Sequence, residues 1–454
     1  MADEGEEEED YQNGYDRFDE LQLSDEAETD SSSSDTATDG DDSSRPISIT
    51  YDPAIPTRHQ YLGEEMDEFS GRTVIEPGQV IELPLMPLPT VVLVPGQTIP
   101  LHLFQSQFVT MMQNVIDKDR TFGLVQGRSM SELQGKVGTT VEIFSRKEEV
   151  EAGITTLTIK AMGRQRFKIL SLRTQVDGIL QATVNILPEI LLSPHPEKAL
   201  ASCFDKFGCQ ATCSGSLERY RQTSGKSRLG SSRKKKINAS LSSWPAWVYK
   251  LYDPFRLMDE IKLELQRWSQ TIRLENVPAD PIDFSYWVAA NLPLDDTLKI
   301  ELLNIDCTTQ RLRKELDIMH KCSVLCCRDC NSTIAYKTDL FCMSLDGPLA
   351  AYVNPHGWVH ETLTFYKATG VRLRGRPTAE NSWFPGYAWT IAECQQCVNH
   401  LGWRFTSVKK GLTPSKFWGL TRASLKPGMR ADSEEELPTE PTSPPPFWSR
   451  GRTS

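Results

Sequence analysis

Short apolar runs broken by proline and glycine begin the part of the chain that we expect to fold. Residues 80–104 read VIELPLMPLPTVVLVPGQTIPLHLF, in which β-branched and leucine runs are interrupted by prolines. This spacing is typical of short strands joined by tight turns. Residues 155–170 repeat the pattern, with alternation in TLTIKA and a turn at Gly163. The pattern predicts a β-rich domain over residues 76–190.

Helical periodicity follows further along the chain. In LMDEIKLELQRWSQTI the apolar residues recur at helical spacing, at Leu257, Ile261, Leu265, Trp268 and Ile272. DDTLKIELLNI and TTQRLRKELDIM show a similar spacing, so we expect several helices between residues 255 and 321. Residues 203–240 are rich in Ser, Gly, Lys and Arg and have almost no periodic apolar positions. They predict a flexible insertion within a helical region that spans residues 191–321.

Alternation returns in residues 322–429, which are dense in glycine, proline and aromatic residues. The segment ETLTFYKATGVRLRGRP alternates and then turns, so we expect a third, all-β domain. The fold class predicted for the whole chain is multidomain α+β. Residues 430–454 are rich in Pro, Ser and Glu and predict a disordered tail.

Charge is unevenly distributed along the chain. The first 45 residues carry 18 Asp and Glu against Arg17 and Arg45, a net charge of −16, whereas the whole chain is at −11, so the remainder carries +5. A segment so charged and so poor in apolar residues cannot bury enough surface to offset its ordering entropy. We therefore expect residues 1–75 to be a largely disordered acidic tail.

The sequence shows no secretory leader and no run of apolar residues long enough for a transmembrane segment, which predicts an intracellular protein. In a reducing compartment its 11 cysteines are expected to be free thiols or metal ligands. Two C-x-x-C pairs, CRDC and CQQC, have the spacing at which thiolates on tight turns share one zinc ion. They predict a structural zinc site formed by Cys327, Cys330, Cys394 and Cys397, with free buried thiols as the alternative.

Nearby cysteines leave the register of this site open, because Cys322 and Cys326 are close enough to compete as ligands. Four thiolates would fill the coordination sphere and leave no position for a catalytic water. No Ser/His/Asp or paired-carboxylate pattern is present either. SGKS lacks the upstream glycine of a phosphate-binding loop, and HETLT lacks the second histidine of a zinc protease. The sequence therefore predicts no catalytic residues.

Three tryptophans, Trp383, Trp389 and Trp403, surround the second cysteine pair. Core filling is the simpler interpretation of each one. As a set they lie on a loop rich in Asn, Pro and Gly that the pair at Cys394 anchors, and Phe405 follows Trp403 at strand spacing. Rigid aromatic walls of this kind form a cage for a cation or for a small flat ring, and the residues alone do not choose between them.

At this point the chain resembles known families. AYVNPHGWVHETLTFYKA, NSWFPGYAWTIAECQQC, GWRF and KFWGLTR resemble the thalidomide-binding CULT domain, a zinc-bearing β-tent, of the cereblon family, through residues 322–429. LPLMPLPTVVLVPGQTIPLHLF, GRQRFKIL and AANLPLDDTLKIELLNI resemble the amino-terminal domain of Lon proteases. We find no stretch of this sequence that resembles the Lon ATPase or protease parts. This order of domains is that of the cereblon family.

The resemblance implies a function. Members of the cereblon family are non-catalytic substrate receptors of a cullin-RING ubiquitin ligase, and they recruit proteins for ubiquitination and proteasomal degradation. Their Lon-like and helical region docks on a β-propeller adaptor called damage-specific DNA-binding protein. Their ligands are glutarimide-type small molecules and proteins that end in a cyclic imide. The resemblance also implies a location in cytoplasm and nucleus. The basic run RKKK could be a nuclear localisation signal or a nucleic-acid patch, but a solvated loop is the simpler interpretation, so we expect no direct binding of nucleic acid.

The resemblance also assigns residues. The four cysteines would bind zinc and the three tryptophans would wall the imide pocket. Phe405 would lie at the base of the pocket and Asn381 at its rim. Asn354 and His356 would lie on the surface where ligand and recruited protein meet.

Several positions depart from the family pattern. Asn381 stands where histidine is expected, Trp358 where tyrosine is more usual, and Ile391 where valine can occur. Residues 203–238 match nothing expected at the place where relatives contact the adaptor. Two rival functions remain open: a reader of methylated lysine, which would need an acidic residue beside the rings, and an enzyme similar to methionine sulfoxide reductases, which would need a reactive cysteine.

Overall fold

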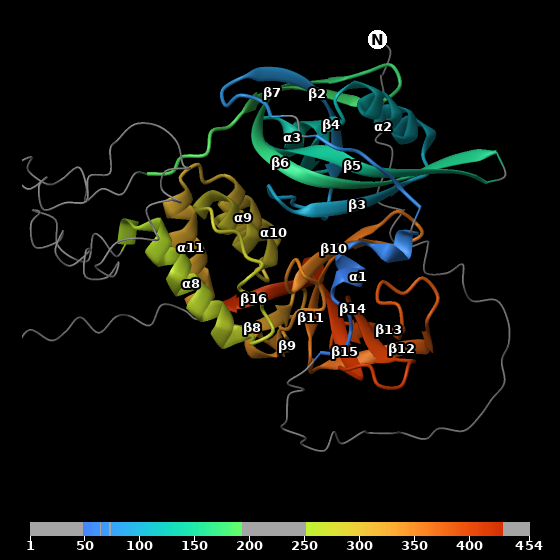
Figure 1. Ribbon diagram of the computed structural model, residues 1–454, viewed down its shortest axis with the longest axis vertical. Coiled ribbons are helices and arrows are strands. Elements are labelled where there is room, and N and C mark those ends of the chain that lie inside the picture. Colours follow the sequence, from blue (N-terminus) through green and yellow to red (C-terminus); the bar gives the residue numbers. More distant parts are fainter. Residues whose placement is uncertain (1–48, 64, 72–73, 152, 193–250, 430–454) are drawn as a thin grey trace, which may run out of the picture. The chain divides into compact units, whose positions relative to one another are not determined.

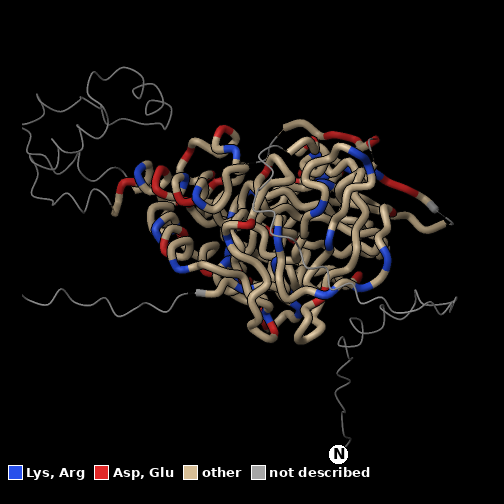
Figure 2. Tube along the Cα trace, turned by 90° about the horizontal axis from the view of Figure 1, so that it is seen from below, with Lys and Arg blue, Asp and Glu red and all other residues tan. Residues whose placement is uncertain are grey.

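The computed structural model describes residues 49–192 and 251–429, apart from residues 64, 72–73 and 152 (Figure 1). Most of the predicted acidic tail, the predicted insertion 203–240 with its basic run, and residues 430–454 lie outside the described residues. Within the described ranges, no helix is long and apolar enough to cross a membrane. Figure 2 shows basic and acidic residues interspersed along the described trace.

The first domain is built on a seven-stranded sheet in the order β1-β5-β4-β2-β7-β6-β3. Strands β5 and β6 also pair with each other, which closes five of the strands into a barrel. Inward positions such as Phe122, Ile159 and Val184 are fully buried. The strands are β1 (Asp67–Glu68), β2 (Val80–Leu88), β3 (Thr98–Leu103), β4 (Thr121–Gln126), β5 (Val137–Glu151), β6 (Ile154–Thr174) and β7 (Leu180–Ile186).

This domain also contains helices that the sequence analysis did not predict. Helix α2 (Ser106–Lys118) buries Val109, Met112 and Val115 against the sheet, and the short helix α3 (Met130–Leu133) buries Leu133. The prediction of a β-rich domain is confirmed.

In the described residues 251–321, helices confirm the helical region: α8 (Pro254–Trp268), α9 (Pro281–Asn291), α10 (Asp296–Leu303) and α11 (Thr308–Lys321). Helices α8 and α9 each begin with a proline that follows an aspartate cap, Asp253 or Asp280. Each cap carboxylate accepts hydrogen bonds from backbone N–H groups of the first turn. A side-chain acceptor at this position satisfies donors that have no partner within the helix.

The last domain is all-β, as predicted. A three-stranded sheet has the order β16-β8-β9, and a six-stranded sheet has the order β10-β11-β15-β14-β13-β12. The first contains β8 (Cys322–Cys327), β9 (Thr333–Tyr336) and β16 (Leu425–Met429). The second contains β10 (Leu349–Val353), β11 (Val359–Phe365), β12 (Val371–Thr378), β13 (Tyr387–Cys394), β14 (His400–Ser407) and β15 (Lys416–Thr421).

The segment that precedes the barrel corrects the predicted tail boundary. Residues 49–63 contain helix α1 (Ala54–Thr57) and the 3-10 turn η2 (Gln60–Leu62). The Tyr51 ring packs 5.5 Å from the Tyr387 ring, and the Thr50 N–H donates to the Thr413 carbonyl at 3.1 Å. The prediction that disorder extends to residue 75 is wrong for this segment, because its aromatic side chains complete the core of the last domain.

Candidate functional site: a four-cysteine cluster and an aromatic cluster

The four predicted cysteines come together at the ends of two hairpins. Cys327 ends β8 and Cys394 ends β13, and each partner lies in the turn that follows. The Sγ atoms of Cys327 and Cys397 are 3.6 Å apart, and those of Cys330 and Cys394 are 3.5 Å apart. All four sulfur atoms lie within 4.8 Å of one another.

The two cysteine turns share one backbone geometry. The Asn331 N–H donates to the Cys327 carbonyl at 3.1 Å, and the Val398 N–H donates to the Cys394 carbonyl at 3.0 Å. Asn331 and Val398 are both left-handed, with φ of 62° and 66°. Asparagine tolerates this conformation, whereas a β-branched residue adopts it at a cost. The second turn is therefore held by its surroundings against the preference of Val398.

The donor set fits zinc. Sulfur atoms about 2.3 Å from a tetrahedral ion lie roughly 3.8 Å from one another, close to the two spacings of the cluster. The competing cysteines are not part of it. Cys322 lies at the other end of β8, where burial raises the pKa of its thiol to about 11, and Cys326 is outside the group of mutually close sulfurs. The register of the predicted site is thus Cys327, Cys330, Cys394 and Cys397.

The tryptophans line one aromatic cluster. The rings of Trp383 and Trp403 meet edge to face at 4.7 Å, and Trp383 stacks on Tyr352 at 5.1 Å. The Trp383 Nε1 donates to the Val353 carbonyl, and the Trp389 Nε1 donates to the Glu380 carbonyl. These bonds fix the ring orientations. Trp389 and Trp403 are only partly buried, whereas Trp383 is 6% exposed.

Phe405 lies beneath this cluster. It is 1% exposed, stacks on Phe417 at 4.9 Å and meets Phe384 edge to face at 4.9 Å. Its strand pairs Phe405 directly with Trp389, so the two side chains share one face of the sheet. Phe405 is thus a buried member of the same aromatic cluster as the three tryptophans.

The three polar residues assigned by resemblance lie on turns. Asn381 is exposed and left-handed, with φ of 52°, on the turn before Trp383. Asn354 Oδ1 accepts hydrogen bonds from the N–H groups of His356 and Trp358, which closes the β10–β11 turn. His356 is exposed on that turn. The turn adjoins the aromatic cluster, since the Trp383 indole N–H donates to the carbonyl of Val353, the residue that precedes Asn354.

Sequence reasoning missed two histidines in this cluster. The centroid of the His360 ring lies 5.1 Å from that of Trp403 and 5.7 Å from that of Trp383. The His400 and Trp403 ring centroids are 4.9 Å apart. Burial, helped by the nearby His400, lowers the pKa of His360 to about 4. The His360 ring is therefore neutral near pH 7. His360 is the second residue of β11, and no local pattern in the sequence marked it.

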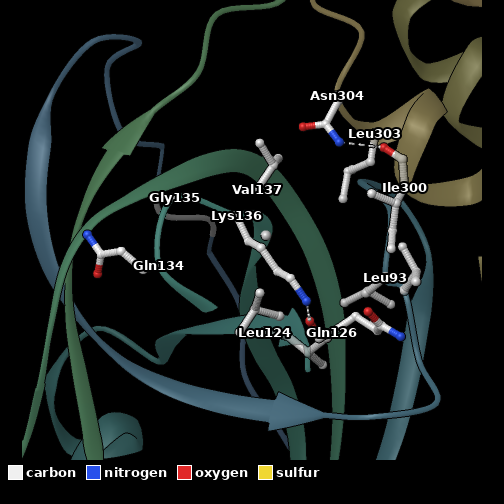
Figure 3. A pocket seen from close by; sticks show the side chains of 13 residues that line it. Leu93, Leu124, Gln126, Gln134, Gly135, Lys136, Val137, Ile300, Leu303 and Asn304 are labelled. Atoms are coloured by element: carbon white, nitrogen blue, oxygen red, sulfur yellow. Dashed lines mark hydrogen bonds between the residues drawn. The ribbon is translucent and has the colours of Figure 1, made fainter. Parts of the chain in front are cut away.

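A separate cavity of about 290 Å³ lies between the barrel and α10 (Figure 3). The Lys136 Nζ on one wall donates to the Gln126 carbonyl at 3.1 Å, and Leu303 and Asn304 come from the helix side. None of the three tryptophans lines it.

Comparison with known proteins matches both halves of this architecture. The family model of the ATP-dependent protease La (LON) substrate-binding domain matches residues 82–321. The model described as Yippee zinc-binding/DNA-binding /Mis18, centromere assembly matches residues 323–438. "Protein cereblon" of Gallus gallus is 48% identical over 411 residues, which cover 88% of this chain and 89% of the relative. The chain belongs to the cereblon family.

Other cereblons agree with this assignment. The Xenopus tropicalis protein is 48% identical, and the match covers 87% of this chain and 89% of the relative. The Danio rerio protein is also 48% identical, and the match covers 87% of this chain and 92% of the relative. The expected Lon-like and CULT-like domains, their order and the family are thereby confirmed.

Proposed function

We propose that this cereblon-family chain is the non-catalytic substrate receptor of a cullin-RING ubiquitin ligase, and that it binds cyclic imides among Trp383, Trp389 and Trp403. The observation that carries the proposal is the edge-to-face pair of Trp383, on the loop before β13, and Trp403, on β14, with ring centroids 4.7 Å apart. Aromatic walls at right angles suit a small flat ring, which packs against their faces. Proteins that end in such a ring, and glutarimide-type drugs, are the proposed ligands.

The surroundings of the rings favour a neutral ligand over methylated lysine. A cation cage gains strength from a carboxylate beside the rings. Glu380 is the nearest acidic residue in sequence to Trp383, and it is exposed; it uses its backbone carbonyl, rather than its carboxylate, to hold Trp389. His360 offers no negative charge. The sulfoxide-reductase alternative needs a reactive thiol, and the cysteines of the adjoining loop, Cys394 and Cys397, belong to the cluster.

We propose one structural zinc ion, held by Cys327, Cys330, Cys394 and Cys397. When bound, it supplies a cross-link between the β8–β9 and β13–β14 hairpins. The matched turn geometry and the left-handed Val398 support this role, since a constrained turn needs an outside restraint. The cross-link would set the position of β13, which carries Trp389.

The adaptor contact is proposed from family membership. The damage-specific DNA-binding protein adaptor would dock on the Lon-like and helical region, which the structure describes as the barrel and helices α8 to α11. Residues 203–240, where the sequence departs from relatives, lie outside the described residues. Location in cytoplasm and nucleus, and the absence of a direct nucleic-acid partner, belong to the same proposal.

A fluorescence titration tests the proposed function. The full-length, zinc-loaded chain is titrated with glutarimide and, separately, with a trimethyl-lysine peptide. Saturable quenching by glutarimide alone, lost in Trp403→Ala and kept in the matched control Trp287→Phe on α9, is the expected result. A response to the peptide alone would contradict the proposal and show that the site binds methylated lysine. Co-purification of the adaptor with the same chain tests the receptor role.

A further inference from the structure

Two cross-strand rows connect the pocket wall to the edge of the six-stranded sheet. Trp403 on β14 lies opposite Ile391 on β13, and Ile391 lies opposite Arg374 on β12. In the next row, Glu393 on β13 lies opposite Arg372 on β12. Residues that oppose each other in an antiparallel pair project from the same face. Both arginines therefore share the face of Trp403.

The two arginines are held in place by one carboxylate. Arg372 donates from Nε and Nη2 to Glu393 Oε2 at 2.9 and 2.7 Å, and Arg374 donates from Nη1 to Oε1 at 3.3 Å. The Glu393 side chain is 6% exposed, whereas those of Arg372 and Arg374 are 48% and 50% exposed. Two guanidinium groups share one carboxylate, which leaves one positive charge and several N–H donors facing solvent.

The position of these arginines differs from that of an ordinary charged edge. Charged side chains on an outer strand often serve only to prevent sheet-edge pairing. Arg376, also on β12 and exposed, fits that description, because no cross-strand partner is aligned with it. Arg372 and Arg374 instead bond to a nearly buried Glu393, so their guanidinium groups are oriented over the sheet face that leads to Trp403.

We propose that Arg374 and Arg372 form a subsite for an acidic side chain that precedes a cyclic imide at the carboxyl terminus of a bound protein. The proposal rests on the imide pocket proposed above and specifies its protein ligands. Neighbouring strands are about 4.8 Å apart, so the backbones of Trp403 and Arg374 lie roughly 10 Å apart across Ile391. An extended chain advances about 3.3 to 3.6 Å per residue, which places the acidic residue roughly three positions before the imide.

The test uses three peptides that end in a glutarimide and differ only in Glu, Gln or Lys three residues before it. Binding to the full-length, zinc-loaded chain is measured by fluorescence polarisation at low and at high salt. The Glu peptide should bind about three- to fivefold more tightly than the Gln peptide at low salt, which is the strength of a good exposed ion pair. High salt should remove most of this difference.

Variants locate the effect. Arg374→Gln with Arg372→Gln should abolish the preference for Glu, and Arg374→Glu should shift it toward the Lys peptide. Arg173→Gln, an exposed arginine on β6 that pairs with Glu82, is the matched control and should change nothing. N-acetyl-aminoglutarimide, which has no preceding residues, should bind all of these forms equally.

The outcomes separate this inference from the proposed function. If N-acetyl-aminoglutarimide does not bind the wild-type chain, the imide pocket itself is wrong. If it binds but the Glu, Gln and Lys peptides have equal affinity, the pocket stands and the acidic subsite is refuted. A preference for Glu that survives in the double Arg→Gln variant would also overturn the assignment to Arg372 and Arg374.

Discussion

Glu361 and Arg422 form an ion pair in which neither side chain is more than 2% exposed, with Arg422 Nη2 2.7 Å from Glu361 Oε2. Lys299 of α10 bonds to the second oxygen of Glu361, and Gln97 from the turn between β2 and β3 joins the same group. Arg422 also reaches Asp296 at 2.7 Å. One network thus joins the barrel, the helices and the last domain, and Glu361 is the residue next to His360, which packs against Trp383 and Trp403.

Neutralising Glu361 should destabilise the chain severely. Glu361→Gln leaves Lys299 buried without its carboxylate and leaves Arg422 with Asp296 alone. Breaking a buried ion pair in this way costs about 3 to 5 kcal/mol. Denaturant unfolding of the full chain measures the loss. Glu149→Gln is the matched control, because Glu149 pairs with Lys147 at the surface and is 44% exposed; its change should stay within about 0.5 kcal/mol. Equal effects of the two substitutions would contradict the structural role of the network.

His360 should make stability fall in mild acid. Burial lowers the pKa of His360 from 6.5 to about 4, so the unfolded chain binds the proton more tightly than the folded chain. Above pH 6.5 the ring is neutral in both states and the free energy of unfolding does not depend on it. As the pH falls from 6.5 toward 4, the free energy of unfolding decreases by on the order of 2 kcal/mol. Urea unfolding between pH 7 and pH 4 should show a smaller loss for His360→Phe than for the wild type.

The matched control for this pH dependence is His356→Phe, on the exposed β10–β11 turn. Because thiolates and other groups also titrate in acid, the informative quantity is the difference between each variant and the wild type. A His360→Phe variant with the same acid dependence as His356→Phe would show that the His360 ring is not shielded from protonation.

Removal of the metal should unfold the last domain. A structural four-cysteine zinc site contributes on the order of 10 kcal/mol to folding. Chelation, or Cys330→Ser, should abolish bound zinc measured by metal analysis and remove the part of the near-ultraviolet circular dichroism that Trp383, Trp389 and Trp403 contribute. Cys326→Ser, one residue before a proposed ligand on β8 but outside the cluster, should retain both. Full zinc content in Cys330→Ser would refute the proposed ligand set.

The turn at Val398 offers a stabilising substitution. Val398 is left-handed and 48% exposed, and its counterpart in the other cysteine turn is Asn331. Val398→Asn should relieve the backbone cost and raise the free energy of unfolding by about 1 kcal/mol, measured by thermal unfolding of the zinc-loaded chain. Val408→Asn, at an exposed site without a positive φ, should give no gain. Destabilisation by Val398→Asn would mean that the valine side chain makes a contact that outweighs its strain.

Local patterns were sufficient for the cysteine cluster and for the three fold regions. The C-x-x-C spacing places two thiols on each tight turn, so a cluster of the two turns was predictable despite their separation, although Cys322 and Cys326 left its register open until the structure brought Cys327 and Cys394 together. Period and turn residues likewise distinguish the barrel from α8 and α11. These signals lie within a few residues of one another, and for that reason they are readable in a single sequence.

Features that depend on distant contacts were missed. The acidity of the first 45 residues masked Tyr51, whose burial depends on Tyr387. Helix α2 was overlooked among prolines and strands, although its apolar positions follow helical spacing. The network around Glu361 joins Lys299 and Arg422 from separate regions of the chain, and no local sequence pattern indicates that a charged residue will be buried. His360 was missed for the same reason, since its neighbours Trp383 and Trp403 come from other segments.

The most direct test of the imide pocket is nuclear magnetic resonance of the indole N–H groups in the full-length, zinc-loaded chain. The chain has ten tryptophans, and each indole gives its own signal. Glutarimide should perturb the signals of Trp383, Trp389 and Trp403 in a saturable way and leave those of Trp268 and Trp287 on the helices unchanged. The absence of any perturbation, or one centred on the helix tryptophans, would contradict the pocket on which the proposed function rests.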